Sequence, residues 1–241
     1  MDRIRLQPLI HLSSDTIHGY EALFRKESSA NYPSASYILD SVASSNRFCN
    51  NFQLFINMTV QDVVNPSFYA SFVDVLEREQ IDGSNVVLEV SESTHPDSLC
   101  IAKKTLCLLR RHNIKIALDD FGTEYSSLSF LNELPIDIVK IDKKFVQDAP
   151  TSRKARALLQ FCVNVSHDLG CEVVAEGIES QDHLECVKNC GVDIGQGFLF
   201  SASPWTLSRK FTPFVELSEL PLFPHEKTPR IVHGWRNFFE N

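Results

Sequence analysis

Residues 114–130 read IKIALDDFGTEYSSLSF, and this stretch decides how the rest of the chain is interpreted. Its first five residues are mostly apolar and β-branched, which predicts a short buried strand. Two adjacent carboxylates, Asp119 and Asp120, stand where this strand ends and a loop turns on Gly122. Adjacent acids repel each other, so a pair of divalent cations bridged by a carboxylate would explain their position. The alternative is that the two aspartates cap the helix that follows.

Polar side chains follow other short apolar runs in the same way. An acid, an amide or a lysine ends each run, and these residues are Glu21, Asn57, Glu89, Lys140, Asp142 and Glu176. In a closed parallel barrel the C-terminal ends of the strands converge on one face, where barrel enzymes keep their active sites. The repetition therefore predicts one shared site.

The spacing of apolar residues predicts about eight strands that alternate with helices. Residues 5–12 and 18–25 are strands joined by a turn at 13–15, and so short a turn makes them an antiparallel hairpin. Further strands are expected at 52–57, 85–90, 114–118, 136–139, 172–176 and 194–200. Helices are expected at 33–49, 60–79, 97–112, 126–131, 151–169, 180–189 and 205–215, with Ser34 as an N-cap and Gly170 as a C-cap. The fold class is α/β: a modified (β/α)8 TIM-type barrel with an antiparallel first strand.

Length and composition favour a single globular domain. The 241 residues are 43% apolar and contain no linker rich in Pro, Gly or Ser, so residues 1–217 are expected to form the barrel. Residues 218–241 are expected to form a C-terminal tail that packs on or beside it. The net charge of -8 argues against bulk nucleic acid and anionic membranes as partners.

The chain shows no signal peptide and no apolar run long enough to span a membrane, so a cytoplasmic location is expected. The odd number of cysteines, seven, fits core or surface thiols of a cytosolic protein. A metal or redox role stays open for Cys186 and Cys190, which stand four residues apart on an expected helix.

Seven short motifs together resemble the EAL domains, the bacterial cyclic di-GMP phosphodiesterases. The resemblance begins at Tyr20-Glu21-Ala22-Leu23-Phe24-Arg25 and extends over residues 5 to about 205. The other six motifs are Ile56–Thr59, Leu88–Glu92, Asp119–Thr123, Lys140–Asp142, Ala175–Glu179 and Gln196–Phe198. Any one of them is weak, but their number and order are specific.

The resemblance implies a two-metal hydrolysis of cyclic di-GMP to linear pGpG. Glu21, Asn57, Glu89 and Asp119 match the ligands of a first Mg²⁺ or Mn²⁺, and Asp119, Asp120 and, through water, Glu176 match those of a second. Ca²⁺ is expected to inhibit. Lys140 matches the lysine that contacts the attacking water, so Glu21, Lys140 and Glu176 are the expected catalytic residues. The alternative for Lys140 is a lone salt bridge to Asp120 or Asp142.

The resemblance also assigns residues around the metals. Gln7, Arg25, Asp142 and Gln196 are expected to contact the substrate, and an arginine fork suits a phosphate or guanine. Gln7 could instead be a strand residue at the barrel bottom. Glu92 and Glu179 are expected to orient loops and ligands.

Two features depart from the pattern that the resemblance implies. Glu124 stands where the family motif DDFGTGYSS has its second glycine, beyond Gly122, in a loop thought to couple the second metal to a homodimer interface. The segment between Glu21 and Asn57 is shorter by about one helix. The alternative function is therefore a catalytically silent EAL protein, acting as a cyclic di-GMP receptor or a protein-binding regulator.

Overall fold

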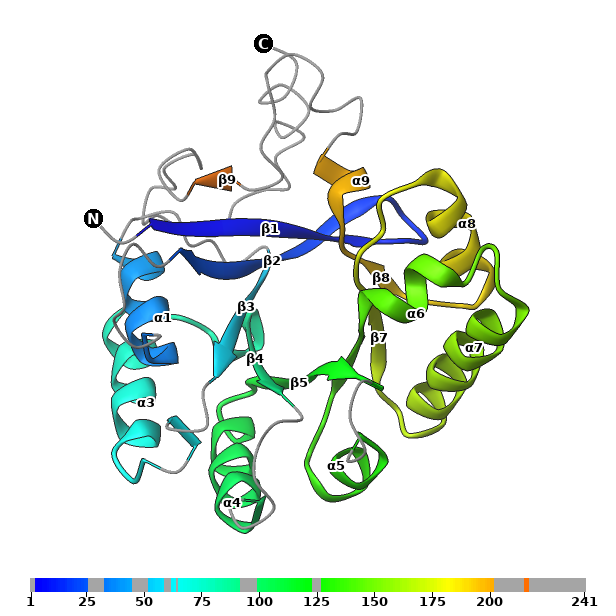
Figure 1. Cartoon of the computed structure of the whole chain (residues 1–241). Helices are drawn as coiled ribbons and strands as arrows, with labels where there is room; N and C mark the ends of the chain where they lie inside the picture. Colours follow the sequence, from blue (N-terminus) through cyan, green and yellow to red (C-terminus); the bar gives the residue numbers. More distant parts are fainter. Residues whose placement is uncertain are drawn as a thin grey trace.

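The computed structural model of the chain describes residues 3–25, 33–44, 52–58, 62–63, 65–91, 99–122, 127–201 and 215–216. Its strands form one mixed sheet that closes into a barrel, with helices around the outside (Figure 1). The strands are β1 (Arg3–His11), β2 (Thr16–Arg25), β3 (Gln53–Met58), β4 (Val86–Ser91), β5 (Lys115–Phe121), β6 (Ile138–Ile141), β7 (Glu172–Ala175), β8 (Ile194–Gly195) and β9 (Val215–Glu216).

The sheet closes through β1, which confirms the expected antiparallel start. β1 is antiparallel to both β2 and β8, while the pairs from β2–β3 to β7–β8 are parallel. The short β9 adds a two-residue ladder to β1. The C-terminal ends of the parallel strands therefore meet at one end of the barrel.

The helices of the described part are α1 (Ala35–Ala43), α3 (Phe68–Arg78), α4 (Leu99–Arg110), α5 (Ser127–Glu133), α6 (Lys143–Asp148), α7 (Arg153–Asp168), α8 (Gln181–Asn189) and α9 (Phe198–Ser201), with a 3-10 turn η1 (Gly83–Asn85). Ser34 caps α1 by accepting a hydrogen bond from the backbone N–H of Tyr37, as expected. Gly170 follows α7 with a φ of 79°, the left-handed conformation expected of a C-cap glycine. No helix within these described ranges is long and apolar enough to cross a bilayer.

Alternation along the strands divides the apolar residues into two clusters. Residues on the outer face join the helices in the main core, for example Leu54 and Ile56 of β3. Residues on the inner face form a separate cluster inside the barrel, here called the plug: Leu9, Phe55, Val87, Ala117, Ile138, Val174 and Ile194. Seven strands each contribute one plug residue, so the barrel interior is filled at this level.

The sequence-based boundaries were wrong at three places. The expected helix 60–79 is interrupted: residues 62–63 are helical, but α3 begins only at Phe68, because Pro66 disfavours helical backbone at the residue before it. β8 ends at Gly195 and α9 follows, so the expected strand 194–200 is interrupted. A Cβ on Gly197 would lie 2.2 Å from the carbonyl oxygen of Ile178, so the chain turns where only glycine fits. α6 was not expected at all.

Some expectations lie outside the described residues. These are the tail 218–241, the loop with Glu124, Glu92, and the helix expected at 205–215 except for Val215, which begins β9 and is therefore not helical. Arg25 ends β2, but the structure describes only its backbone.

Candidate active site

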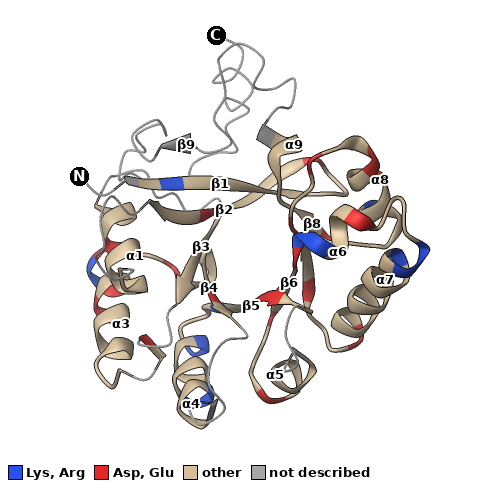
Figure 2. Cartoon of the chain, viewed as in Figure 1, with Lys and Arg blue, Asp and Glu red and all other residues tan. Residues whose placement is uncertain are grey.

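Period-two alternation builds the site directly on the plug. In six of the strands, or directly after them, the residue two positions beyond the plug residue is polar: Phe55 is followed by Asn57, Val87 by Glu89, Ala117 by Asp119, Ile138 by Lys140, Val174 by Glu176 and Ile194 by Gln196. The apolar layer thus fixes a ring of polar side chains at the C-terminal end of the barrel. Figure 2 shows acidic segments on β2 and β5 near this ring.

Lys140 lies at the centre of the ring. Its Nζ is 2.9 Å from Glu89 Oε1, 3.0 Å from Asp119 Oδ1 and 2.8 Å from Glu176 Oε1. Glu21 Oε2 is 3.6 Å away. The lysine side chain is only 1% exposed, so this is a buried ammonium held by four carboxylates and not a lone salt bridge to Asp120 or Asp142.

Glu21 is held by two amides, one on the neighbouring strand β3 and one directly after β8. Asn57 Nδ2 donates to Glu21 Oε1 at 3.0 Å, and Gln196 Nε2 donates to Glu21 Oε2 at 2.6 Å. Gln196 is itself fixed because its backbone N–H donates to the Ala175 carbonyl and its own carbonyl accepts from the Ile178 N–H. The two amides therefore set the orientation of the carboxylate.

Burial and like charge perturb the acids of the ring. Burial raises the pKa of Glu89 well above its usual value, and the charge of Glu21 adds to this rise. Burial also raises the pKa of Glu176 to about 7, although Lys140 opposes the change. For Lys140, burial lowers the pKa, but the attraction of Glu176, Glu21, Glu89 and Asp119 outweighs it and raises the pKa. The clustered carboxylates therefore stabilise positive charge at the centre of the ring.

The end of β5 adds a second, more exposed acid to the ring. The β5–β6 register shifts between Leu118 and Phe121, and Asp120 has a φ of 55°. This distortion leaves Asp120 exposed while Asp119 points into the ring. Burial and the neighbouring Asp119 and Asp142 raise the pKa of Asp120. One oxygen each from Asp119, Asp120 and Glu176 lie within 4.8 Å of one another.

The residues fit hard divalent cations. Glu89 Oε2 and Gln196 Oε1 are buried and accept no hydrogen bond from the described residues. An unsatisfied buried carboxylate oxygen is costly, and a cation would satisfy it. Carboxylate and amide oxygens are the donors that Mg²⁺, Mn²⁺ and Ca²⁺ prefer.

The structure also describes four other expected site residues, which lie around the ring. Gln7 lies directly opposite Glu21 in the β1–β2 ladder, so its side chain is on the same face and at the site end of the barrel, not at the bottom. Asp142 instead caps α6, accepting from the Lys144 N–H at 2.9 Å. Glu179 is exposed, and its carboxylate accepts from Gln147 Nε2 at 3.1 Å. Gly122 has a φ of 96°, and a Cβ there would lie 2.8 Å from the Phe145 ring.

Lys144 was missed by the sequence analysis. It follows the capping residue Asp142 in the first turn of α6, and its charge lowers the pKa of Asp120. Figure 2 shows the basic segment where α6 begins. The Asp142 cap after a strand was the signal that could have revealed this helix and its lysine.

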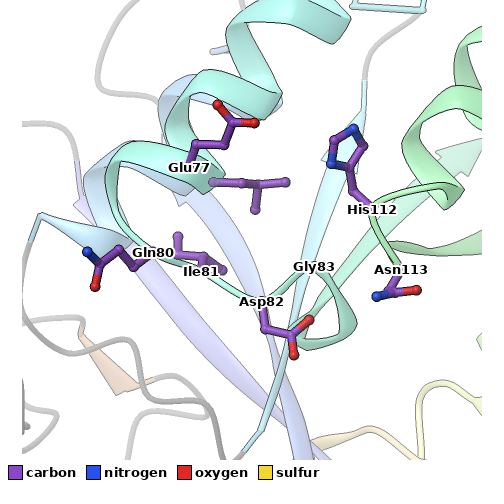
Figure 3. Close-up of a pocket in the computed structure, with 8 residues that line it drawn as sticks. Glu77, Gln80, Ile81, Asp82, Gly83, His112 and Asn113 are labelled. Atoms are coloured by element: carbon purple, nitrogen blue, oxygen red, sulfur yellow. The ribbon is translucent and has the colours of Figure 1, made fainter.

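A depression elsewhere on the surface carries no comparable chemistry. It lies between the α3–β4 and α4–β5 connections, with Asp82, Gly83 and His112 in its wall (Figure 3). Asp82 accepts from the Ser84 N–H, and His112 Nε2 is 2.9 Å from the hydroxyl of Tyr69. The Asp82 and His112 side chains therefore already have structural partners.

Comparisons with known proteins place this geometry in a family. The EAL domain family matches residues 35–203. A cyclic di-GMP phosphodiesterase of Pseudomonas aeruginosa is 35% identical over 149 residues, which cover 62% of this chain and 25% of that protein. The chain spans about a fifth to a quarter of the length of the curated relatives it matches first.

Solved structures agree in fold. The EAL domain of Mycobacterium smegmatis DcpA superposes with a TM-score of 0.74 at 26% identity, covering 82% of this chain and 89% of that one. Klebsiella pneumoniae BlrP1, solved with calcium and cyclic di-GMP, gives a TM-score of 0.73 at 27% identity and covers 82% of this chain and 54% of that one. The antiparallel first strand of the barrel and the ring of polar residues at the strand ends agree with a family match over most of the chain's length. This chain belongs to the EAL domain family.

Proposed function

We propose that this chain is a metal-dependent phosphodiesterase that hydrolyses cyclic di-GMP to linear pGpG. The observation that carries the proposal is the buried Lys140 ammonium at 2.8–3.0 Å from three carboxylates of three different strand ends. A charged donor in a ring of oxygen ligands suits hydrolysis of a phosphodiester by an activated water. The likeness to a Pseudomonas aeruginosa enzyme named for cyclic di-GMP supports the choice of substrate.

The metal assignment rests on the donor set and its charge. Glu21, Asn57, Glu89 and Asp119 would hold one Mg²⁺ or Mn²⁺, and Asp119, Asp120 and Glu176 the other. With all five carboxylates ionised, the single ammonium would leave four negative charges, which two divalent cations would balance. When bound, such ions lower the pKa of a coordinated water and polarise the phosphodiester.

The chain's own residues would orient the reacting groups. Asn57 and Gln196 hold the two oxygens of Glu21, so this carboxylate is fixed before any substrate arrives. The Lys140 ammonium would donate to the attacking water, with Glu176 beside it. Because Gln196 Nε2 is bonded to Glu21, we assign Gln196 a positioning role in addition to the expected substrate contact.

Residues around the metal ligands would bind the substrate or support the loops of the site. Gln7 and Arg25, both on the β1–β2 hairpin, would meet the phosphate or guanine of the substrate. Asp142 would contact the substrate in addition to capping α6, Glu179 and Glu92 would support the surrounding loops, and Gly122 with Glu124 would shape the connection after β5. A cytoplasmic location and a homodimer remain part of the proposal.

Turnover of cyclic di-GMP by the purified chain, with Mg²⁺, Mn²⁺ or neither, followed by separation of the products, tests the function. We expect pGpG as the product and no turnover after metal chelation. Glu172→Gln, an acid at the opposite end of the barrel, is the matched control for Glu21→Gln. Binding of cyclic di-GMP without hydrolysis under all metal conditions would establish the silent receptor instead.

A further inference from the structure

Two histidines meet at the end of the barrel opposite the acidic ring. His11 is the last residue of β1, and His18 lies on β2 just after the hairpin turn. His11 Nε2 and His18 Nδ1 are 2.8 Å apart, and the ring centroids are separated by 4.4 Å. Both side chains are half-buried, and the His18 ring lies 5.9 Å from the ring of the plug residue Phe55.

A β-bulge brings the two rings together. In the β1–β2 ladder Leu9 pairs with Gly19, but the next pair is Ile10 with Ile17, so His18 is the extra residue. An extra residue changes the direction of its side chain relative to regular alternation. Gly19 allows the close approach of β3 beside the bulge, because a Cβ there would lie 2.2 Å from the Gln53 carbonyl oxygen.

The surroundings keep His18 neutral and orient its ring. Burial lowers the pKa of His18 to about 4, with a further contribution from His11. His18 Nε2 and Gln53 Oε1 are both buried without a hydrogen bond of good geometry, but the Gln53 side chain raises the His18 pKa as an acceptor does. A proton on Nε2 of the neutral His18 ring leaves a lone pair on Nδ1, the atom that lies 2.8 Å from His11 Nε2.

We propose that His11 Nε2 and His18 Nδ1 form a two-nitrogen binding site for a borderline divalent transition-metal cation, of the class of Zn²⁺, Ni²⁺ and Cu²⁺. Neutral imidazole nitrogens are the ligands that these ions prefer over carboxylate oxygens. At metal–nitrogen distances of about 2.0–2.1 Å, two ligands at a right angle lie about 2.9 Å apart, close to the observed 2.8 Å. Without metal, a hydrogen bond between the two nitrogens occupies the site.

The two charged side chains near the histidines, Glu172 and Lys115, have opposite effects on a bound cation. Glu172 raises the pKa of His18 and Lys115 lowers it, and the two are paired at 2.6 Å. Their effects on a bound cation oppose each other, so selectivity rests on the nitrogen donors. Partial exposure of both histidines leaves room for water to complete the coordination.

The test is a calorimetric titration of tag-free protein with Ni²⁺. Saturating Mg²⁺ is present throughout, so that sites with oxygen ligands are already filled. We expect one Ni²⁺ per chain. Loss of a hydrogen-bond partner of a metal ligand typically weakens metal binding by roughly 10- to 100-fold, and we expect Gln53→Ala to weaken Ni²⁺ binding within this range. His11→Gln and His18→Gln each remove a ligand and should weaken Ni²⁺ binding at least as much. His167→Gln, an exposed histidine paired with Asp193, is the matched control and should bind like the parent.

Two results would overturn the proposal. Absence of stoichiometric Ni²⁺ binding by the parent means that the pair is a hydrogen bond only. Equal binding by the parent and both histidine variants means that thiols or other groups hold the ion. Circular dichroism of each variant establishes folding, and because His11 ends its strand, His11→Gln decides the matter if His18→Gln does not fold. The proposal does not depend on phosphodiesterase activity.

Discussion

Replacing Lys140 with methionine tests the central ion cluster through stability. Methionine keeps the apolar stem and removes only the ammonium, which has carboxylate oxygens at 2.8, 2.9 and 3.0 Å. Removing one partner from a buried ionic cluster typically costs about 3–5 kcal/mol, because the remaining charges are left uncompensated. In metal-free protein we therefore expect Lys140→Met to lower the free energy of unfolding by that amount.

Mg²⁺ should reduce this deficit. A ligand that binds only the folded state at about 100 times its Kd stabilises it by about 2.7 kcal/mol. The variant should gain more than the parent, because no ammonium repels the incoming cation. Urea unfolding of parent and variant, each with EDTA and with excess Mg²⁺, gives the four free energies needed.

Lys115→Met is the matched control for this cycle. Lys115 lies on β5 at the opposite end of the barrel and pairs with Glu172, and the two side chains are 34% and 39% exposed. Such a pair contributes about 0–1 kcal/mol, and its loss should not depend on Mg²⁺. The reasoning is refuted if Lys140→Met costs as little as the control, or if its cost is the same with and without Mg²⁺.

Three further predictions concern chemistry and pH. Glu21→Gln should abolish turnover of cyclic di-GMP while circular dichroism shows that the variant stays folded, and parental activity in this variant would remove Glu21 from the metal site. Ca²⁺ should support binding of cyclic di-GMP with little turnover, because it accepts looser geometry than Mg²⁺; equal rates with both ions, measured by product separation, would contradict this. Burial raises the pKa of Cys162 to about 11, above its ordinary 9.0, so the folded state keeps the proton longer than the unfolded chain and stability should fall between pH 9 and 11. Cys162→Ala should make this fall less steep in urea unfolding, while Cys190, whose pKa burial also raises to about 11, accounts for a further part of it; an unchanged slope would exclude the Cys162 thiol as a cause.

The ring of polar strand ends was predictable because it depends on local alternation. An apolar inner residue followed two positions later by an acid, amide or lysine can be read from each strand alone, as for Ala117 and Asp119. The antiparallel start was predictable for the same reason, since a three-residue turn leaves little choice. The comparisons confirm the family that these motifs indicated.

The partners within the ring could not be read from the sequence. Lys140 contacts Glu89 and Glu176 because barrel closure brings β4, β6 and β7 to one centre, and no local pattern encodes that distance. The contact of Gln196 with Glu21 links residues 175 positions apart. The early end of β8 depends on the backbone of Ile178 blocking a Cβ at Gly197, which is also a long-range fact.

The plug makes the two ends of the barrel separate chemical environments. Asp119 and Lys115 are four residues apart on β5, which corresponds to about 13 Å along a strand. Between them lies an apolar layer with no described polar member, so neither end can share a ligand with the other. The acidic ring lies at one end and the two imidazoles at the other, and hard and borderline cations should distribute between them accordingly. This separation is why Mg²⁺ can be held in excess while Ni²⁺ is titrated, and why Lys115→Met reports on ion-pair loss without disturbing the acidic ring.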